Sequence, residues 1–252
     1  TTQQVNVTIQ PLPVVNVTGD IGFCDNHSST LTASEKYGNE LTYTWANHTE
    51  GENPIIVTEG GTYSVTGQDP TTGCISNVIT YQVTKYPNPS DISIETSGAP
   101  CKGSTIKLTA SSTSAADYDY EWFNKKNGEN VILGNTNELS INVIDTEKYY
   151  VIAKEKHQLS NGSILTCYSE ELDTTITERE IPTWDFNDIS VCEGIEETLS
   201  VKNHTPGTTF TWVNESTGST QSGTSIKETI HGTVVYTVTG TLNECSNSKT
   251  FP

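Results

Sequence analysis

Six cysteines are the residues of this chain whose type and number most directly indicate a chemistry. They are Cys24, Cys74, Cys101, Cys167, Cys192 and Cys245. An even number of cysteines is typical of disulfide-bonded proteins from oxidising compartments. A zinc site would need ligand pairs a few residues apart, and these cysteines are not spaced in that way. Disulfide formation is therefore the predicted chemistry, and it indicates an extracellular or cell-surface location.

Nothing in the sequence indicates catalysis. The histidines stand singly near turns or polar segments, and none recurs beside a serine, cysteine or carboxylate that could act with it. No nucleophile with a base, zinc spacing or phosphate-binding loop is visible either. We therefore expect exposed histidines, no cofactor and a protein that is not an enzyme. The five histidines are His27, His48, His157, His204 and His231.

The acidic stretch "DYDYEW" is the stronger of two candidates for metal binding. It places Asp117, Asp119 and Glu121 on one face of a strand and aromatic residues on the other. Clustered oxygen atoms are what calcium prefers. However, there is no Asp-x-Asp-x-Asp-Gly loop, so a solvated acidic face is the favoured interpretation and calcium the alternative. Asp185 and Asp188, near a predicted joint, form a weaker candidate of the same kind.

Trp184, in "IPTWDF", is the one tryptophan that no other part of the sequence repeats. Its place between two predicted units favours packing at their joint. An exposed indole ring that stacks on a sugar is the alternative, because carbohydrate binding needs an aromatic platform.

The charge of the chain excludes one class of partner. Its 31 acidic and 13 basic residues give a formal net charge of −18. Since binding to phosphates requires lysine and arginine, nucleic acid is not expected as a partner. No apolar run approaches the length of a membrane-spanning helix, so insertion into a membrane is not expected.

Three repeats with five shared markers position these residues. Each begins with a cysteine and continues with Leu-Thr-Ala or Leu-Ser-Val and then an aromatic strand ending in tryptophan. The tryptophan follows the cysteine by 21, 21 and 20 residues in the three repeats. A Tyr-x-Val strand and a second cysteine close each repeat. Such internal similarity predicts a tandem array.

The repeats are predicted to span residues 12–86, 87–181 and 182–252, with insertions in the middle one. Proline-containing segments, "YPNPS" and "IPTW", mark the two joints. Residues 1–11, "TTQQVNVTIQP", resemble the last strand of a preceding repeat. Because the chain also starts without a signal segment and stops inside "CSNSKTFP", we expect it to be a piece of a longer array.

The pattern within each repeat predicts an all-β fold. Apolar and polar residues alternate in short segments such as "TLTAS" and "TYSVT", and turn-forming residues separate these segments. About seven short strands per repeat are typical of an immunoglobulin-like antiparallel β-sandwich. We therefore expect three such sandwiches in tandem. Their core aromatic residues are predicted to be Trp45, Trp122, Trp212, Tyr63, Tyr149 and Tyr236.

Disulfide bonds within the repeats are predicted to stabilise these small domains. They would join Cys24 to Cys74, Cys101 to Cys167 and Cys192 to Cys245, and would each contribute about 4 kcal/mol by restricting the unfolded chain. Each pair must lie at the same end of its sandwich, because bonded cysteines have Cα atoms only about 5 to 6 Å apart. If the strand directions separate them, bridges between neighbouring repeats are the alternative.

The markers resemble those of immunoglobulin-like and PKD-like repeats in very large surface proteins of Bacteroidota. The similar residues are "CKG" at 101–103, "CEG" at 192–194, "YTW" at 43–45, "GTYSV" at 61–65 and "GC" at 73–74. The first repeat departs from the pattern with "CDN", and the middle one with "EKYYV". The resemblance implies a cell-surface adhesin or stalk attached to the outer membrane, in some members exported by the type IX secretion system and used in gliding motility.

The expected function is therefore structural and adhesive. The repeats would extend a binding region from a cell surface or contact a substratum, with neighbouring repeats and surface polysaccharide as partners. The alternative is a carbohydrate- or calcium-binding accessory module of a secreted protein.

Overall fold

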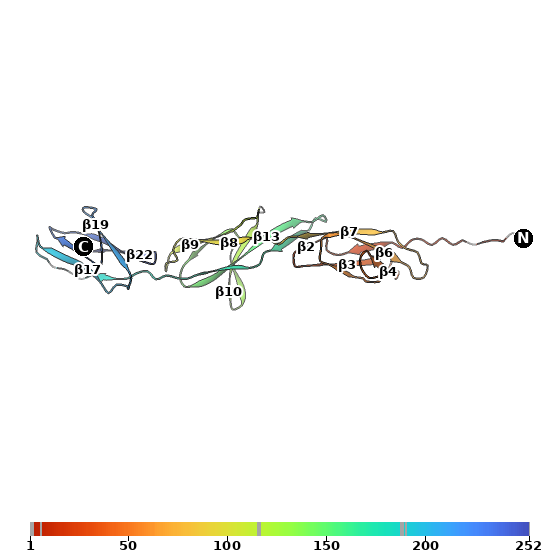
Figure 1. Ribbon diagram of the computed structural model, residues 1–252, viewed down its shortest axis with the longest axis horizontal. Coiled ribbons are helices and arrows are strands. Elements are labelled where there is room, and N and C mark those ends of the chain that lie inside the picture. Colours follow the sequence, from red (N-terminus) through yellow and green to blue (C-terminus); the bar gives the residue numbers. More distant parts are fainter. Residues whose placement is uncertain (1–2, 6, 115–116, 187–188, 190, 252) are drawn as a thin grey trace. The chain divides into compact units, whose positions relative to one another are not determined.

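The protein has an all-β, multi-domain fold of immunoglobulin-like sandwiches (Figure 1). The computed structural model describes residues 3–5, 7–114, 117–186, 189 and 191–251. All the regular secondary structure of these residues is β-strand, so none of them lies in a helix that could cross a membrane. This agrees with the alternating sequence pattern, because threonine, valine, isoleucine and tyrosine favour a pleated, half-buried surface.

The first repeat forms two sheets that face each other. One sheet has the order β1 (Val15–Thr18), β3 (Ser29–Glu35) and β5 (Ile55–Val57). The other has the order β2 (Gly22–Cys24), β7 (Ile79–Tyr86), β6 (Gly61–Gln68) and β4 (Thr42–Trp45). All pairs are antiparallel except β2 with β7, which run parallel. This parallel pair places Cys24 opposite Tyr86, at the end of β7.

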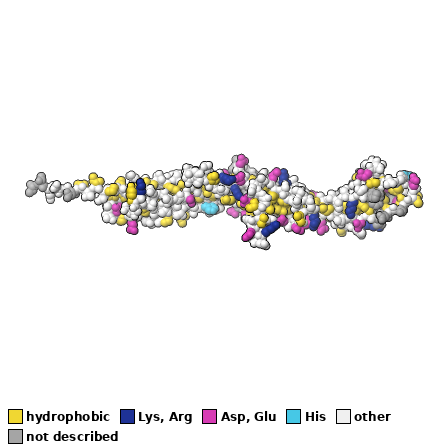
Figure 2. Space-filling model, turned by 180° about the vertical axis from the view of Figure 1, so that it is seen from behind, with side chains coloured by type: hydrophobic (Ala, Val, Ile, Leu, Met, Phe, Trp, Pro, Cys, Tyr) yellow, Lys and Arg dark blue, Asp and Glu magenta, His cyan; other side chains and the backbone are white. Residues whose placement is uncertain are grey.

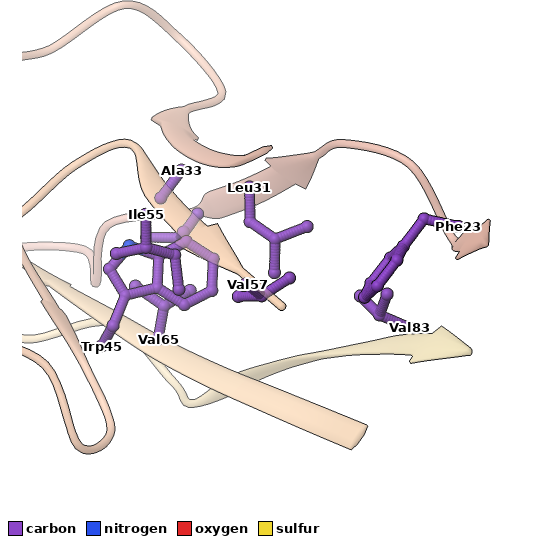
Figure 3. Packing of buried hydrophobic residues seen from close by; sticks show 9 residues of the cluster. Phe23, Leu31, Ala33, Trp45, Ile55, Val57, Val65 and Val83 are labelled. Atoms are coloured by element: carbon purple, nitrogen blue, oxygen red, sulfur yellow. The ribbon is translucent and has the colours of Figure 1, made fainter. Parts of the chain in front are cut away.

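Inward-facing residues of both sheets make the core of the first repeat. In β3, buried residues alternate with more exposed ones, so that Leu31 and Ala33 point inward. They pack in a cluster with Trp45, which is only 1% exposed. Figure 3 shows Trp45 beside Val65 within this cluster. Tyr63 is partly buried and packs against the same cluster.

The second repeat contains the longest strand of the described chain. One sheet has the order β12 (Glu138–Asn142), β9 (Thr105–Ser112) and β8 (Ile92–Ser97). The other has the order β11 (Glu129–Gly134), β10 (Asp119–Lys126), β13 (Glu147–Gln158) and β14 (Ile164–Tyr168), and β15 (Leu172–Ile176) also pairs with β13. The first half of β13 faces β15 and its second half faces β14. Trp122 and Tyr149 are buried, at 0% and 6% exposure.

The third repeat again has two sheets. One sheet has the order β16 (Asp185–Phe186), β17 (Glu196–Lys202) and β20 (Ser225–Thr229). The other has the order β19 (Thr220–Ser222), β18 (Thr209–Asn214), β21 (Tyr236–Leu242) and β22 (Cys245–Phe251). Trp212 and Tyr236 lie in its core, with their ring centroids 6.0 Å apart in an edge-on arrangement. The Trp212 indole donates a hydrogen bond to the Gly223 carbonyl, so this buried polar group is satisfied.

A small residue recurs four positions after the marker tyrosine of each repeat. These residues are Gly67, Ala153 and Gly240. A Cβ atom on Gly240 would approach Trp184 to 2.7 Å, and one on Gly67 would approach Val15 to 2.8 Å. The small residue at this position is visible in the sequence. The packing explains it, because core side chains approach the strand backbone too closely for a larger residue.

Contacts along the chain define two compact units. The first comprises residues 1–92, 112–119 and 152–170, and the second comprises residues 93–111, 120–151 and 171–252. The second half of β13, from residue 152, and β14 thus belong to the same compact unit as the first repeat, whereas residues 147–151 of β13 belong to the second unit. The three repeat boundaries given above remain a prediction from the sequence.

On the face shown in Figure 2, basic side chains are scattered among acidic and neutral ones.

Candidate functional site: disulfide-linked joints

The disulfide bonds differ from those predicted within the repeats. The structure joins Cys24 to Cys167 and Cys101 to Cys245, while Cys74 and Cys192 are free. The predicted pairs Cys24–Cys74, Cys101–Cys167 and Cys192–Cys245 are therefore wrong. The alternative, bridges from one repeat to the next, is the one that the structure contains.

Strand direction explains this correction in the first repeat. Cys24 lies opposite Tyr86, the last residue of β7, whereas Cys74 lies in the turn that precedes β7. The two cysteines are therefore near opposite ends of the same strand. Because a strand rises about 3.3 Å per residue, the length of β7 separates them by roughly 20 Å. A disulfide cannot cross that distance.

The first joint is built around the bond between Cys24 and Cys167, which lie in β2 and β14. Their Cα atoms are 5.6 Å apart, and their side chains are buried, at 6% and 0% exposure. Both cysteines belong to the first compact unit. The bond fastens the β13–β14 hairpin of the middle repeat to the end of the first sandwich.

Apolar contacts accompany this bond. The rings of Tyr86 and His157 are stacked, with centroids 4.2 Å apart. Next to them, a Cβ atom built on Gly22 would lie 3.0 Å from both Leu159 and Tyr86. Glycine at this position therefore lets the hairpin approach β2 closely.

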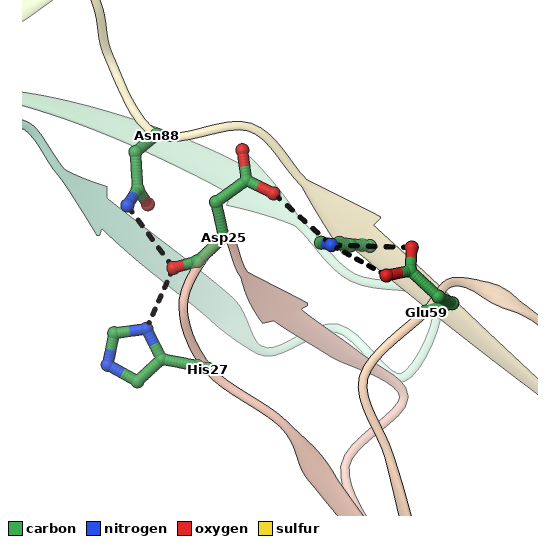
Figure 4. Close-up of polar contacts among 5 residues, drawn as sticks. Asp25, His27, Glu59 and Asn88 are labelled. Atoms are coloured by element: carbon green, nitrogen blue, oxygen red, sulfur yellow. Dashed lines mark hydrogen bonds and ion pairs between the residues drawn. The ribbon is translucent and has the colours of Figure 1, made fainter.

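Polar contacts order the chain on the other side of Cys24 (Figure 4). The Asp25 amide donates to the carbonyl of Tyr86 over 2.9 Å, and the Asn88 side chain donates to the carbonyl of Asp25 over 3.2 Å. The carboxylate of Asp25 is 3.6 Å from Lys85, which is 3.2 Å from Glu59. The hydrogen bond with Glu59 raises the pKa of Lys85 above its ordinary value. Because solvent reaches all three charged groups, their ion pairs contribute little to the stability of the fold and mainly orient the side chains.

A pocket of about 470 Å³ opens beside the bond, within the first compact unit. Residues 19–24 of the first repeat form part of its wall, and residues 163–166 of the hairpin form another part. Asn88 also lines it, and the side-chain oxygen of Asn88 is buried without a hydrogen-bond partner among the described residues. The pocket is thus lined by both of the segments that the bond joins.

The second joint lies in the second compact unit and is centred on Cys101 and Cys245. Their Cα atoms are also 5.6 Å apart. Arg179 contacts the turn before Cys245 twice, with 2.5 Å to the Glu244 carboxylate and 3.1 Å to the Asn243 carbonyl. An ion pair thus takes the place that the aromatic stack has in the first joint.

The two joints share one geometry. In each, the first cysteine pairs in parallel with a residue near the end of its own repeat. Cys24 pairs with Tyr86, the last residue of β7, and Cys101 forms an isolated bridge with Arg179, three residues after β15. In each, the second cysteine belongs to the hairpin of the next repeat. The two bonds span 143 and 144 residues. The repeat markers therefore encode a joint as well as a core.

His157 was missed as a residue of the joint. The sequence predicted exposed histidines, but the side chain of His157 is only 15% exposed, and its ring lies on that of Tyr86. The prediction is wrong for this residue. No repeated marker includes it, because the second joint has the ion pair of Arg179 with Glu244 in place of the ring stack, so the repeats could not reveal it.

The acidic strand face is spread over exposed and partly exposed positions. Asp117 and Asp119 are exposed, and Glu121 is partly exposed. The carboxylate of Asp119 accepts a hydrogen bond from Lys156 over 2.6 Å, and this bond lowers the pKa of Asp119. Within the described residues, no group of three histidine, cysteine or acidic side chains is placed to hold a metal ion. Asp188, the other acidic candidate besides Asp185, lies outside the described residues.

Trp184 lies inside the third sandwich rather than at its surface. It is 1% exposed, and its ring meets that of Phe210 edge-on at 5.3 Å. The ammonium group of Lys249 lies over the ring and donates a hydrogen bond to the Trp184 carbonyl. Packing is therefore the role of this residue, in the core of the third repeat, and its ring is not accessible to a sugar.

Substitution of Gly22 with valine is expected to weaken the first joint. Side-chain atoms at this position meet Leu159 and Tyr86, so the hairpin must move away from β2. Such overpacking costs about 1–3 kcal/mol. Urea denaturation should report the loss, and the Cys24–Cys167 bond should be reduced faster by dithiothreitol.

Gly61→Val is the matched control, since a Cβ atom on Gly61 has no neighbour within 4 Å and the residue also lies in a strand of the first repeat. Equal reduction rates in the two variants would show that the close approach at Gly22 does not support the bond.

No protein-family model matches the chain, and no curated protein matches it in sequence. Among solved structures, it is similar to the three N-terminal domains of the highly immunogenic outer capsid protein of bacteriophage RB49, with 15% identity, a TM-score of 0.36 and coverage of 95% of this chain and 96% of that one. It is also similar to the FN1–FN3 domains of chicken CNTN1, with 13% identity, a TM-score of 0.34 and coverage of 95% and 98%. For the N-terminal four Ig domains of Dscam1 isoform 6.9, the identity is 11%, the TM-score 0.25 and the coverage 96% and 73%.

The formed disulfides indicate where the protein resides. Disulfide bonds such as these two persist in oxidising compartments and are rare in the cytosol of most organisms. The protein is therefore extracellular.

Proposed function

We propose that this chain is a non-enzymatic, load-bearing segment of a large bacterial cell-surface adhesin. It extends or mediates surface attachment, and the parent protein is held at the outer membrane. Its partners are neighbouring repeats of the same kind and, at the attached surface, polysaccharide or a substratum. The resemblance of the repeat markers to Bacteroidota surface proteins supports this assignment. The single observation that carries it is that both disulfides run from one repeat to the next.

Such bonds change how a chain transmits force. The segment enclosed by Cys24 and Cys167 overlaps the segment enclosed by Cys101 and Cys245. Between the two bonds, three stretches of chain therefore run in parallel. A force applied to the ends is shared among them, and the stretch of 66 residues from Cys101 to Cys167 limits the extension.

The proposal predicts a large difference in extensibility. Pulled by its ends in a single-molecule force experiment, the oxidised chain should reach a contour length of about 35 nm, and the reduced chain about 90 nm, at roughly 3.6 Å per residue. The oxidised chain should also need a higher force for its longest extension step. The double variant Cys74→Ser/Cys192→Ser is the control, because it removes the free thiols and keeps both bonds.

An oxidised chain that extends to about 90 nm would contradict a load-bearing role, since the bonds would then not lie in the path of the force. Unfolding at the same force with and without reductant would contradict it as well.

A further inference from the structure

The geometry points to a binding site for a neutral oligosaccharide in the pocket beside the Cys24–Cys167 bond. The inference deepens the proposed function and rests on it, because polysaccharide is one of the partners proposed there. It adds the place where such a chain binds and the class of sugar that the place accepts. All the described residues that line the pocket belong to the first compact unit.

The size of the pocket suits a short stretch of a polysaccharide chain. Its volume of about 470 Å³ lies within the range of roughly 300–1,000 Å³ that is typical of small-molecule sites. Such sites combine an apolar wall with a few polar groups that fix the orientation of the ligand. The pocket has both, and they come from different segments of the chain.

Strand β14 supplies the apolar wall. Ile164, Thr166 and Tyr168 lie two residues apart along it, so their side chains share one face, and all three line the pocket. Ile164 is 63% exposed and Tyr168 is 50% exposed. An aromatic ring with a polar tip can stack on the C–H face of a sugar ring and hydrogen-bond through its hydroxyl. Tyr168 therefore offers the exposed platform that the buried Trp184 does not.

A second wall carries hydrogen-bonding groups in fixed positions. The side chains of His27 and Asn88 both donate to the carbonyl of Asp25, over 3.1 and 3.2 Å (Figure 4). Because Nδ1 of His27 is the donor, Nε2 of the neutral ring is an acceptor. The side-chain oxygen of Asn88 is buried without a partner among the described residues. A ligand hydroxyl that donates to this oxygen would remove the cost of an unpaired polar atom.

The turn between β13 and β14 adds a donor. Asn161 and Ser163 are exposed and line the pocket. The side-chain oxygen of Asn161 accepts hydrogen bonds from the amide and the hydroxyl of Ser163, over 3.0 and 2.7 Å. These bonds orient the Asn161 side chain and leave its NH₂ group to donate to a sugar hydroxyl. Sugar hydroxyls both donate and accept, so a site with both kinds of group matches them.

The charge of the lining selects neutral sugars. Among the described residues that line the pocket there is no lysine or arginine, and Asp20 contributes a carboxylate. An acidic sugar such as a uronic acid would find no cation in this lining, and Asp20 would repel it. The same carboxylate can accept hydrogen bonds from the hydroxyl groups of a neutral sugar.

The test measures binding of the oxidised full chain to an array of oligosaccharides. The neutral probes are glucan, mannan, xylan and galactan fragments, and the acidic probes are polygalacturonate and alginate fragments. At least one neutral probe should bind, and isothermal titration calorimetry should give it a dissociation constant below about 1 mM. The acidic probes should bind at least about tenfold more weakly, because the lining offers them no cation.

Tyr168→Ala tests the platform. Loss of the ring should weaken binding of the best neutral probe at least about tenfold. Because Tyr168 is half exposed, the variant should fold, and urea denaturation checks this. Tyr37→Ala is the matched control, since Tyr37 is 73% exposed in the same compact unit and does not line the pocket. This control should bind as tightly as the unchanged chain.

Three outcomes would overturn the inference: no neutral probe binds, acidic probes bind as tightly as neutral ones, or the two tyrosine variants have equal affinity. None of them bears on the load-bearing role. Tyr168→Ala keeps both disulfides, so its contour length under force should equal that of the unchanged chain. Failure of the sugar site and failure of the proposed function are thus measured separately.

Discussion

Replacement of both Cys24 and Cys167 by serine is expected to lower the free energy of unfolding of the first compact unit by about 5 kcal/mol. The bond closes a segment of 143 residues, and its main effect is to restrict the unfolded chain. The loss should be visible in urea denaturation followed by tryptophan fluorescence, as a shift of the transition to lower urea.

The control is the double variant Cys74→Ser/Cys192→Ser. It also removes two sulfur atoms but no bond, and it should change the free energy of unfolding by less than about 0.5 kcal/mol. If the two double variants were equally stable, the bond between the repeats would not contribute to folding.

Substitution of Trp45 with alanine is expected to cost about 3–5 kcal/mol and to unfold the first sandwich. Trp45 is 1% exposed and packs in the cluster that contains Leu31, Ile55 and Val65 (Figure 3). A single small domain has only about 5–15 kcal/mol of stability in total. Limited proteolysis should therefore cut the first repeat of this variant and leave the third intact.

Tyr37→Ala is the matched control, since this aromatic side chain in the same repeat is 73% exposed. It should remain resistant to the protease. Resistance of the Trp45→Ala chain would contradict the assignment of this residue to the core.

The cores were predictable from the sequence because their signal is local. Alternation over a few residues determines which side chains point inward, and repetition shows which of them belong to the core of every repeat. The structure accordingly buries Leu31, Leu108 and Leu199, the leucines of the three equivalent markers. The strands that carry them follow from the same pattern.

The disulfide pairing was not predictable in this way because it depends on the direction and length of a strand. The sequence places one cysteine before the second strand of a repeat and the other after the last hairpin turn. Only the parallel pairing of β2 with β7 shows that Cys24 lies at the far end from Cys74. The sequence allowed bridges within and between repeats, and the structure distinguishes them.

The joint contacts were hidden for a different reason. Tyr86 and His157 in one joint correspond to Arg179 and Glu244 in the other. The positions are equivalent, but the residue types differ, with a ring stack in the first joint and an ion pair in the second. A search for shared residue types therefore passes over them. Trp184 shows the converse. It has no equivalent in the other repeats, so the sequence predicts that it packs at a joint, and the structure places it in the core of the third repeat.

The turn "DPTTG" at residues 69–73 has a role that the structure clarifies. Asp69 accepts hydrogen bonds from the amide of Thr71 over 2.8 Å and from the hydroxyl of Thr72 over 2.8 Å. These bonds lower the pKa of Asp69. The turn also accepts a hydrogen bond from the Cys74 amide at the Thr72 hydroxyl, and thereby holds Cys74 in place after the turn.

A disulfide map obtained without reduction tests the central claim most directly. Trypsin cleaves after lysine and arginine, and every cysteine of this chain then lies in a different peptide: residues 1–36, 37–85, 86–102, 157–179, 180–202 and 228–249. After alkylation of free thiols, mass spectrometry should find peptide 1–36 linked to 157–179, peptide 86–102 linked to 228–249, and the other two alkylated. Linkage of 1–36 to 37–85, or of 86–102 to 157–179, would contradict joints clamped from repeat to repeat.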